Sequence, residues 1–154
     1  MQAIKFRVFR PSKGRMMTWD ELDASLMFDA DGSQMTTELF ADHGMDEPPP
    51  VVMQFTGLLD KLGNEIYEGD VVRVAWLAEL GYTELDCGAI ACVVYDDCAF
   101  VAEFNKPYKR QVCEEGTYEE TSLSLTKHSH DDDVCLSFTI IGNAYENPEL
   151  LNTK

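Results

Sequence analysis

Long apolar runs are missing from this sequence. No stretch approaches the ~18 consecutive apolar residues that a membrane-spanning helix needs, although 45% of the residues are hydrophobic. The first residues, Met1-Gln2-Ala3-Ile4-Lys5, also lack the apolar core of a secretory signal. The sequence therefore predicts a cytoplasmic protein without a membrane partner. Its 154 residues are enough to bury one core without a disulfide or a metal.

Basic residues are scarce as well. Only 12 Lys and Arg stand against 28 Asp and Glu, which gives a net charge of −16. Because phosphate neutralisation dominates nucleic-acid binding, we expect no nucleic-acid partner. Residues 1–15 contain no acid, and removing their local +5 from −16 leaves −21 for residues 16–154. The five cations of this segment are Lys5, Arg7, Arg10, Lys13 and Arg15. The acidic runs either are solvated loops or form a surface that receives a basic element, such as this segment.

Cysteine pairs with a recognisable spacing are absent. The cysteines are Cys87, Cys92, Cys98, Cys113 and Cys135. Their number is odd, and no two have the Cys-x-x-Cys spacing of a zinc or redox motif. We therefore predict reduced thiols with a structural role. A Gly-rich phosphate loop and a Gly-x-Ser-x-Gly nucleophile elbow are absent too, so we predict no catalytic residue, no cofactor and no enzyme activity.

Three segments nevertheless contain residue types that could carry chemistry. The run His128-Ser129-His130-Asp131-Asp132-Asp133 contains metal-ligand types, but its residues are consecutive and no other segment supplies an obvious partner ligand. The segment Asp29-Ala30-Asp31-Gly32-Ser33 begins like a calcium loop, yet Gln34 and Phe40 stand where Gly and Glu are required. His43 has no nucleophile motif near it. We interpret all three as surface segments and predict no metal site.

The most informative stretch, residues 53–72, is rich in turn chemistry. Asp60 and Gly63 occupy the first and fourth positions of a type I turn, which predicts a hairpin joining the strands on either side. Gly69 can adopt a positive φ without a Cβ clash, and the Asp70 carboxylate can accept from nearby backbone N–H groups. A strand is therefore expected to begin at Val71.

This stretch also resembles the central motif of the YopX family of phage and prophage proteins. The matching residues are Gln54-Phe55-Thr56-Gly57-Leu58, Asp60, Gly63 and Ile66-Tyr67-Glu68-Gly69-Asp70-Val71-Val72. A second motif, Ile140-Ile141-Gly142-Asn143-Ala144-Tyr145-Glu146-Asn147-Pro148-Glu149-Leu150-Leu151, is similar to the C-terminal motif of that family, and Ile4-Lys5-Phe6-Arg7-Val8 resembles its start. Departures from the family pattern are Phe9, Leu59, Leu62 and Ala144. The resemblance implies a phage or prophage origin and the host cytoplasm, and it implies no activity, cofactor or catalytic residue.

Alternating apolar residues predict strands along much of the chain. In the N-terminal part, Ile4, Phe6 and Val8 alternate with Lys5 and Arg7, and a second strand is expected at Arg15-Met16-Met17. Thr18 and Glu21 have capping-box spacing, which predicts a helix from Trp19 to Met27 with Leu22 and Leu26 inward. In the body, the residues expected on shared strand faces are Val72, Val74 and Trp76; Ile90, Cys92 and Val94; Phe100, Ala102 and Phe104; Leu123 and Leu125; and Val134, Leu136, Phe138 and Ile140.

An acidic, Pro-rich connector over residues 42–50 suggests the domain boundary. We expect a small N-terminal subdomain over residues 1–50 and a β-barrel-like body over residues 51–154. The predicted fold class is α+β, mostly antiparallel β, with an SH3-like barrel and a short C-terminal helical turn whose N-cap is Asn147 and whose first residue is Pro148.

The sequence favours a non-enzymatic protein-interaction or self-assembling module. Its expected partners are further copies of the same chain and a host or phage protein. Two alternatives stay open. One is a metal-dependent hydrolase that uses His128, His130 and Asp131-Asp132-Asp133. The other is an acidic decoy of a DNA-binding host protein, which the charge of −16 permits.

Overall fold

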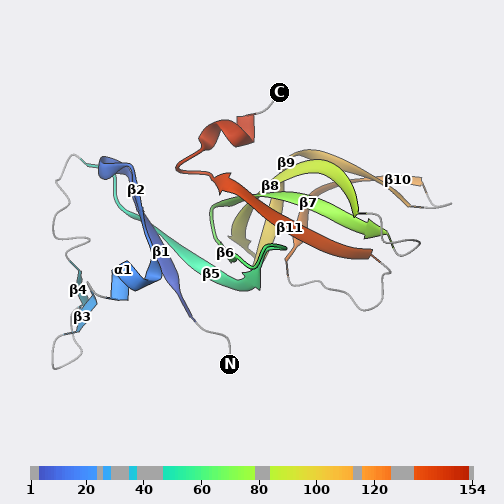
Figure 1. The fold of residues 1–154 in the computed structure, drawn as a ribbon. Helices are drawn as coiled ribbons and strands as arrows, with labels where there is room; N and C mark the ends of the chain where they lie inside the picture. The colour runs from blue at the N-terminus through green and yellow to red at the C-terminus, as the bar shows by residue number, and fades with distance from the viewer. Residues whose placement is uncertain are drawn as a thin grey trace. The chain divides into compact units, whose positions relative to one another are not determined.

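Antiparallel β-structure dominates the fold (Figure 1). The computed structural model describes residues 4–23, 26–28, 35–37, 47–78, 84–112, 116–125 and 134–152. The chain divides into two units, Met1–Gly57 and Leu58–Lys154. The strand orders are β2-β1-β5-β6 in one sheet, β10-β9-β8-β7-β11 in the second and β3-β4 in a short ribbon. Within the described residues, no helix is long and apolar enough to cross a membrane.

The first unit contains the elements β1 (Phe6–Arg10), η1 (Pro11–Lys13), β2 (Arg15–Met17), α1 (Trp19–Asp23), β3 (Leu26–Phe28), β4 (Met35–Thr37) and most of β5 (Val51–Leu59). Strand β1 lies between β2 and β5 and pairs antiparallel with both. Its small core consists of Val8 and Leu22, with Phe6 and Met17 packed against them.

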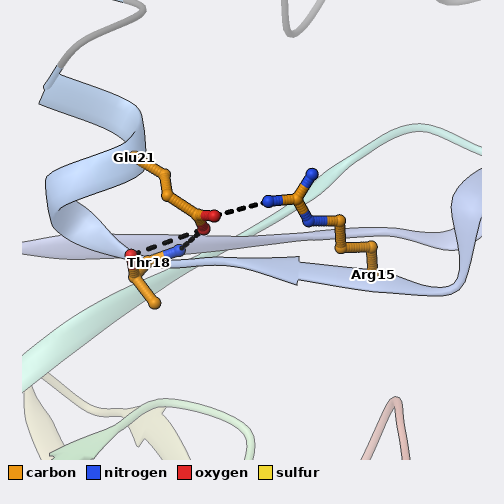
Figure 2. A network of polar contacts seen from close by, with 3 residues as sticks. All are labelled: Arg15, Thr18 and Glu21. Atoms are coloured by element: carbon orange, nitrogen blue, oxygen red, sulfur yellow. Dashed lines mark hydrogen bonds and ion pairs between the residues drawn. The ribbon is translucent and has the colours of Figure 1, made fainter.

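The Glu21 half of the predicted capping box is present at the start of α1 (Figure 2). The backbone N–H of Thr18 donates to Oε2 of Glu21 at 2.9 Å, and Arg15 forms an ion pair with Oε1 of the same carboxylate. These contacts, led by the Thr18 N–H bond, lower the pKa of Glu21. The bond from the Thr18 N–H to Glu21 therefore stabilises the first turn of the helix.

Two predictions for this unit are wrong. The helix ends at Asp23 and does not continue to Met27, because residues Leu26–Phe28 pair with β4 as strand β3. The short helix has Asp20 and Glu21 in its first turn but no cation in its last turn, so no side chain of that turn offsets the negative end of its dipole. Ile4, predicted to lie inward, is 70% exposed, whereas both Val8 and Phe9 are buried. The two buried neighbours point to opposite faces of β1.

The second unit contains β6 (Glu65–Tyr67), β7 (Asp70–Ala78), β8 (Glu84–Asp96), β9 (Ala99–Val112), β10 (Gly116–Ser124), β11 (Val134–Asn143) and η2 (Pro148–Asn152). Its five-stranded sheet curves as half of a barrel. The buried core consists of Ile66, Val72, Val74, Ala91, Val93, Ala102, Phe104, Leu125 and Phe138. The predicted hairpin around Asp60 and the C-terminal helical turn are both confirmed.

Ile90, Cys92 and Val94 share one face of β8, as predicted, but it is not the buried face. Ala91 and Val93 are fully buried, whereas Ile90, Cys92 and Val94 are only partly buried. The register pairs Val93 with Ala102, which also pairs with Leu123. Because side chains alternate between the two faces of a sheet, this register turns Cys92 and Val94 to the outer face.

Candidate functional site

The Asp60 turn, residues 60–64, links two strands that are distant in the sequence. Oδ1 of Asp60 accepts from the backbone N–H groups of Leu62 at 2.9 Å and Asn64 at 2.8 Å. Oδ2 accepts from the side-chain amide of Asn64 at 3.1 Å and from the N–H of Ile140 at 3.3 Å. In addition, the N–H of Lys61 donates to the carbonyl oxygen of Phe138 at 2.9 Å. The turn is therefore held against β11.

Hydrogen bonds stabilise the ionised form of the Asp60 carboxylate. Burial of the carboxylate raises its pKa, but the hydrogen bonds from Asn64, Ile140 and Leu62 together outweigh burial and leave the pKa below its ordinary value. Four donors occupy the two oxygens. We conclude that this carboxylate holds the turn and is poorly placed to act as a general base.

Gly69 and Asp70 form a second tie. Gly69 has a φ of +79°; its N–H donates to Val93 at 2.7 Å, and its carbonyl accepts from Ala144 at 2.8 Å. Oδ2 of the buried Asp70 accepts from the N–H of Tyr67 at 2.8 Å. The expected positive φ and carboxylate-to-backbone bond are thus confirmed, and strand β7 begins at Asp70.

The C-terminal motif is also turn chemistry. Oδ1 of the buried Asn143 accepts from the N–H of Tyr145 at 2.9 Å, and the N–H of Asn143 donates to Oδ1 of Asn147 at 3.2 Å. A Cβ at Gly142 would lie 2.5 Å from Cδ1 of Leu150 and 2.8 Å from Oδ1 of Asn147, so a larger residue there would displace these two side chains. The motif therefore packs η2 closely against the end of β11.

The two motifs meet in the structure. Asp60 bonds to Ile140, Gly69 bonds to Ala144, and Asp70 pairs with Asn143 in the β7–β11 register. These contacts join turns and strand ends, which explains the residue types without a ligand. They also cover part of the edge of β11 that faces away from β7. There, the carbonyl oxygen of Phe138 accepts from the N–H of Lys61, and the N–H of Ile140 donates to Asp60.

The opposite edge of this sheet is different. Among the described residues, β10 pairs with β9 alone. The N–H of Leu125 donates to Phe100 of β9 at 3.0 Å. Because backbone groups alternate along an antiparallel strand, the N–H groups of Leu123 and Leu125 point to β9 and that of Ser122 points away from it. We call this side of β10 the open edge.

A hollow of about 460 Å³ adjoins the open edge. Its lining consists of Val94, Tyr95, Asp96, Val101, Glu103, Thr121 and Ser122. It lies where the β9–β10 register shifts between Glu120 and Ser122. The lining contains two carboxylates and no cation. We call it the outer-face hollow, because Val94, Glu103 and Ser122 are on the face opposite the buried Val93 and Ala102.

Negative charge extends beside the hollow. Burial first, and then the charges of Glu103, Asp70 and Glu68, raise the pKa of the half-buried Cys92 thiol to about 11. Burial, Glu68 and Cys92 likewise raise the pKa of Tyr145. Cys92 faces Glu103 directly in the β8–β9 register. This part of the sheet therefore favours cations and keeps the thiol protonated.

Several predicted segments lie outside the described residues. They are Asp29-Ala30-Asp31-Gly32-Ser33, His43, Cys113, and the run from His128 and His130 through Asp131, Asp132 and Asp133. Their interpretation stays a prediction. In the part of the chain that the structure does describe, no group of three or more His, Cys, Asp or Glu side chains could hold a metal ion. Cys92 and Cys98 are free thiols.

Sequence reasoning missed the outer-face hollow and the open edge. Glu103 stands between the core residues Ala102 and Phe104, and Asp96 ends β8, so alternation could have placed both on the solvent side. The sequence contains no signal for their approach to Ser122. That approach depends on the irregular pairing of β9 with β10.

Comparison with known proteins identifies a family and a similar solved structure. The profile described as "YopX protein" matches residues 5–152, which confirms the resemblance of the two motifs. Among solved structures, the chain is similar to the crystal structure of protein EF1440 from Enterococcus faecalis, with 24% identity, a TM-score of 0.49, and coverage of 98% of this chain and 99% of that one. No curated protein matches.

Proposed function

The chain belongs to the YopX protein family, and from this membership and its open β10 edge we propose that it is a non-catalytic protein-interaction module. We further propose that it is encoded by a phage or prophage and acts in the host cytoplasm. Its partners are a second copy of the chain and host or phage proteins that can present a strand. The module uses no cofactor.

The contrast between the two edges of the five-stranded sheet carries this proposal. An unpaired strand edge presents backbone donors and acceptors to any other strand, and proteins usually cover or blunt such edges. Here the Asp60 turn covers part of β11, whereas the described residues leave β10 paired on one side only. Within the described part of the chain, β10 is an edge strand with one neighbour, and such a strand is suited to the addition of a partner strand.

The polar groups of the two family motifs support a binding role over catalysis. Asp60, Asp70 and Asn143 accept hydrogen bonds from backbone N–H groups and thereby hold the scaffold. An SH3-like barrel is our proposal for this unit. It is supported by the meander of β7, β8, β9 and β10, after which β11 returns to the side of β7.

Removal of one outward N–H group tests the proposal. Ser122→Pro deletes the donor that points to the open edge and is compatible with an edge strand, whereas Ser122→Thr keeps the donor and the strand propensity. We expect light scattering to report association for the wild type and Ser122→Thr, and a monomer for Ser122→Pro. Capture from host lysate should show the same order for any second protein. Thermal melts verify that both variants fold.

Identical behaviour of the three proteins in both assays would contradict the proposal. The open edge would have no role if the wild type were monomeric and captured the same proteins from lysate as Ser122→Pro does. If only the self-association differs, the partner is a second copy.

A further inference from the structure

The outer-face hollow begins beside the open edge of β10 and extends across β9 toward β8. Ser122 of β10 pairs with Glu103 of β9, which pairs with Cys92 of β8. Residues directly opposite each other share one face, so the three side chains form a row on the outer face. Val101 and Val94 form the adjacent row. A strand added beside β10 would extend these rows by one position.

The distance from an added strand to β9 suits a long side chain on the added strand. Neighbouring strands lie about 4.8 Å apart, so an added strand would lie roughly 10 Å from β9. The short Ser122 side chain leaves the path across β10 open. A Lys or Arg side chain can lay its aliphatic stem on apolar surface and extend its charge to a carboxylate. Val94 and Val101 provide the apolar surface, and Glu103 and Asp96 provide the carboxylates.

We infer that the outer-face hollow selects an extended partner segment that carries Lys or Arg at the position opposite Ser122. This inference rests on the proposed addition of a strand to β10 and names the chemistry of that strand. Both carboxylates of the lining are exposed, so they can meet a partner cation. An acidic side chain at the same position would face Glu103 across the short Ser122, and like charges that face each other are destabilising.

The experiment uses three peptides that differ at one position. The probes are acetylated and amidated Thr-Val-Arg-Val-Thr and its counterparts with Gln or Glu in place of Arg. Binding to the full chain is measured by calorimetry and by NMR shift changes. We expect the order Arg, then Gln, then Glu. Glu103→Gln should reduce the preference for Arg over Gln by up to about fivefold, which corresponds to ~1 kcal/mol for an exposed charge pair.

Glu149→Gln is the matched control. It makes the same change of net charge on η2 and lies outside the lining of the hollow, so the preference for Arg should persist. Raising the salt concentration to 0.5 M should weaken the preference in the wild type, because exposed pairs are screened.

Each outcome separates this inference from the proposed function. Equal binding of the three peptides, abolished by Ser122→Pro, would overturn the charge selection and support strand addition. If Glu149→Gln reduced the preference for Arg as strongly as Glu103→Gln does, the assignment of this preference to the hollow would be overturned. If no peptide binds while Ser122→Pro still abolishes self-association, the occupant is a second copy and the selection of cations is overturned. If neither peptide binding nor association occurs, both proposals fail.

Discussion

Asp60 shows how one side chain can hold two distant parts of a chain. Its carboxylate closes its own turn through Leu62 and Asn64 and reaches the N–H of Ile140. Four donors surround the group, and a carboxylate that accepts several hydrogen bonds is held in its ionised form. The residue therefore couples the stability of this unit to pH.

We predict that Asp60→Asn removes a pH-dependent part of the stability. The folded pKa of Asp60 is lowered, so its contribution is complete above the unfolded pKa of about 3.9 and is lost as the pH falls toward the folded pKa. In the variant, the NH2 group of the amide faces N–H donors and cannot accept their hydrogen bonds. This should cost about 1 kcal/mol at neutral pH. Urea unfolding at pH 7, 5, 4 and 3 measures both effects.

The difference between wild type and Asp60→Asn should shrink below pH 4. Asn64→Ala is the control, because it removes one side-chain donor and leaves the titrating carboxylate in place. A difference that stays constant down to pH 3 would show that folding does not lower the pKa of Asp60.

At the scale of elements, turns could be predicted from the sequence and strand faces could not. The turn at Asp60 and the positive φ of Gly69 depend on residues within a few positions, so local residue types suffice. The run Ala89-Ile90-Ala91-Cys92-Val93-Val94 is apolar throughout, so alternation alone cannot choose its buried face. Only the pairing of Val93 with Ala102 decides it. The open edge and the outer-face hollow depend on such pairing and were missed for the same reason.

The β8–β9 hairpin offers a test at this scale. Its two-residue loop has positive φ at both positions, +41° at Asp97 and +64° at Cys98, as a type I′ turn requires. Left-handed backbone costs about 1–2 kcal/mol for a residue with a Cβ, and Gly avoids this cost at an entropic loss of about 0.5–1 kcal/mol. We predict that Cys98→Gly raises the free energy of unfolding by about 0.5–1 kcal/mol.

Ala99→Gly is the matched control, since Ala99 has no positive φ and begins β9. It should lower stability, because only the entropic loss applies. Denaturant melts under reducing conditions compare the variants. Equal losses in both would show that the turn imposes no strain at Cys98.

At the scale of the whole molecule, charge decides how partners approach. The chain carries −16 overall, whereas residues 1–15 carry +5. The sequence suggested that the basic strand seeks a partner surface. In the structure, β1 pairs with β2 on one side and β5 on the other, so both of its edges are used within the chain.

We therefore predict opposite salt effects for the two kinds of partner. Two copies that each carry −16 repel each other, and raising the ionic strength from 0.01 to 0.15 M shortens the Debye length from about 30 to 8 Å. Self-association through the open edge should thus strengthen over this range, because backbone pairing persists while repulsion is screened. Binding of the Arg peptide should weaken, since attraction between opposite charges is screened. Light scattering and peptide titration in the same buffers measure both. A different result would locate the contact at the basic N-terminal segment. In that case the oligomer would dissociate as the salt concentration rises, and the triple change of Lys5, Arg7 and Arg10 to Ser would make it monomeric.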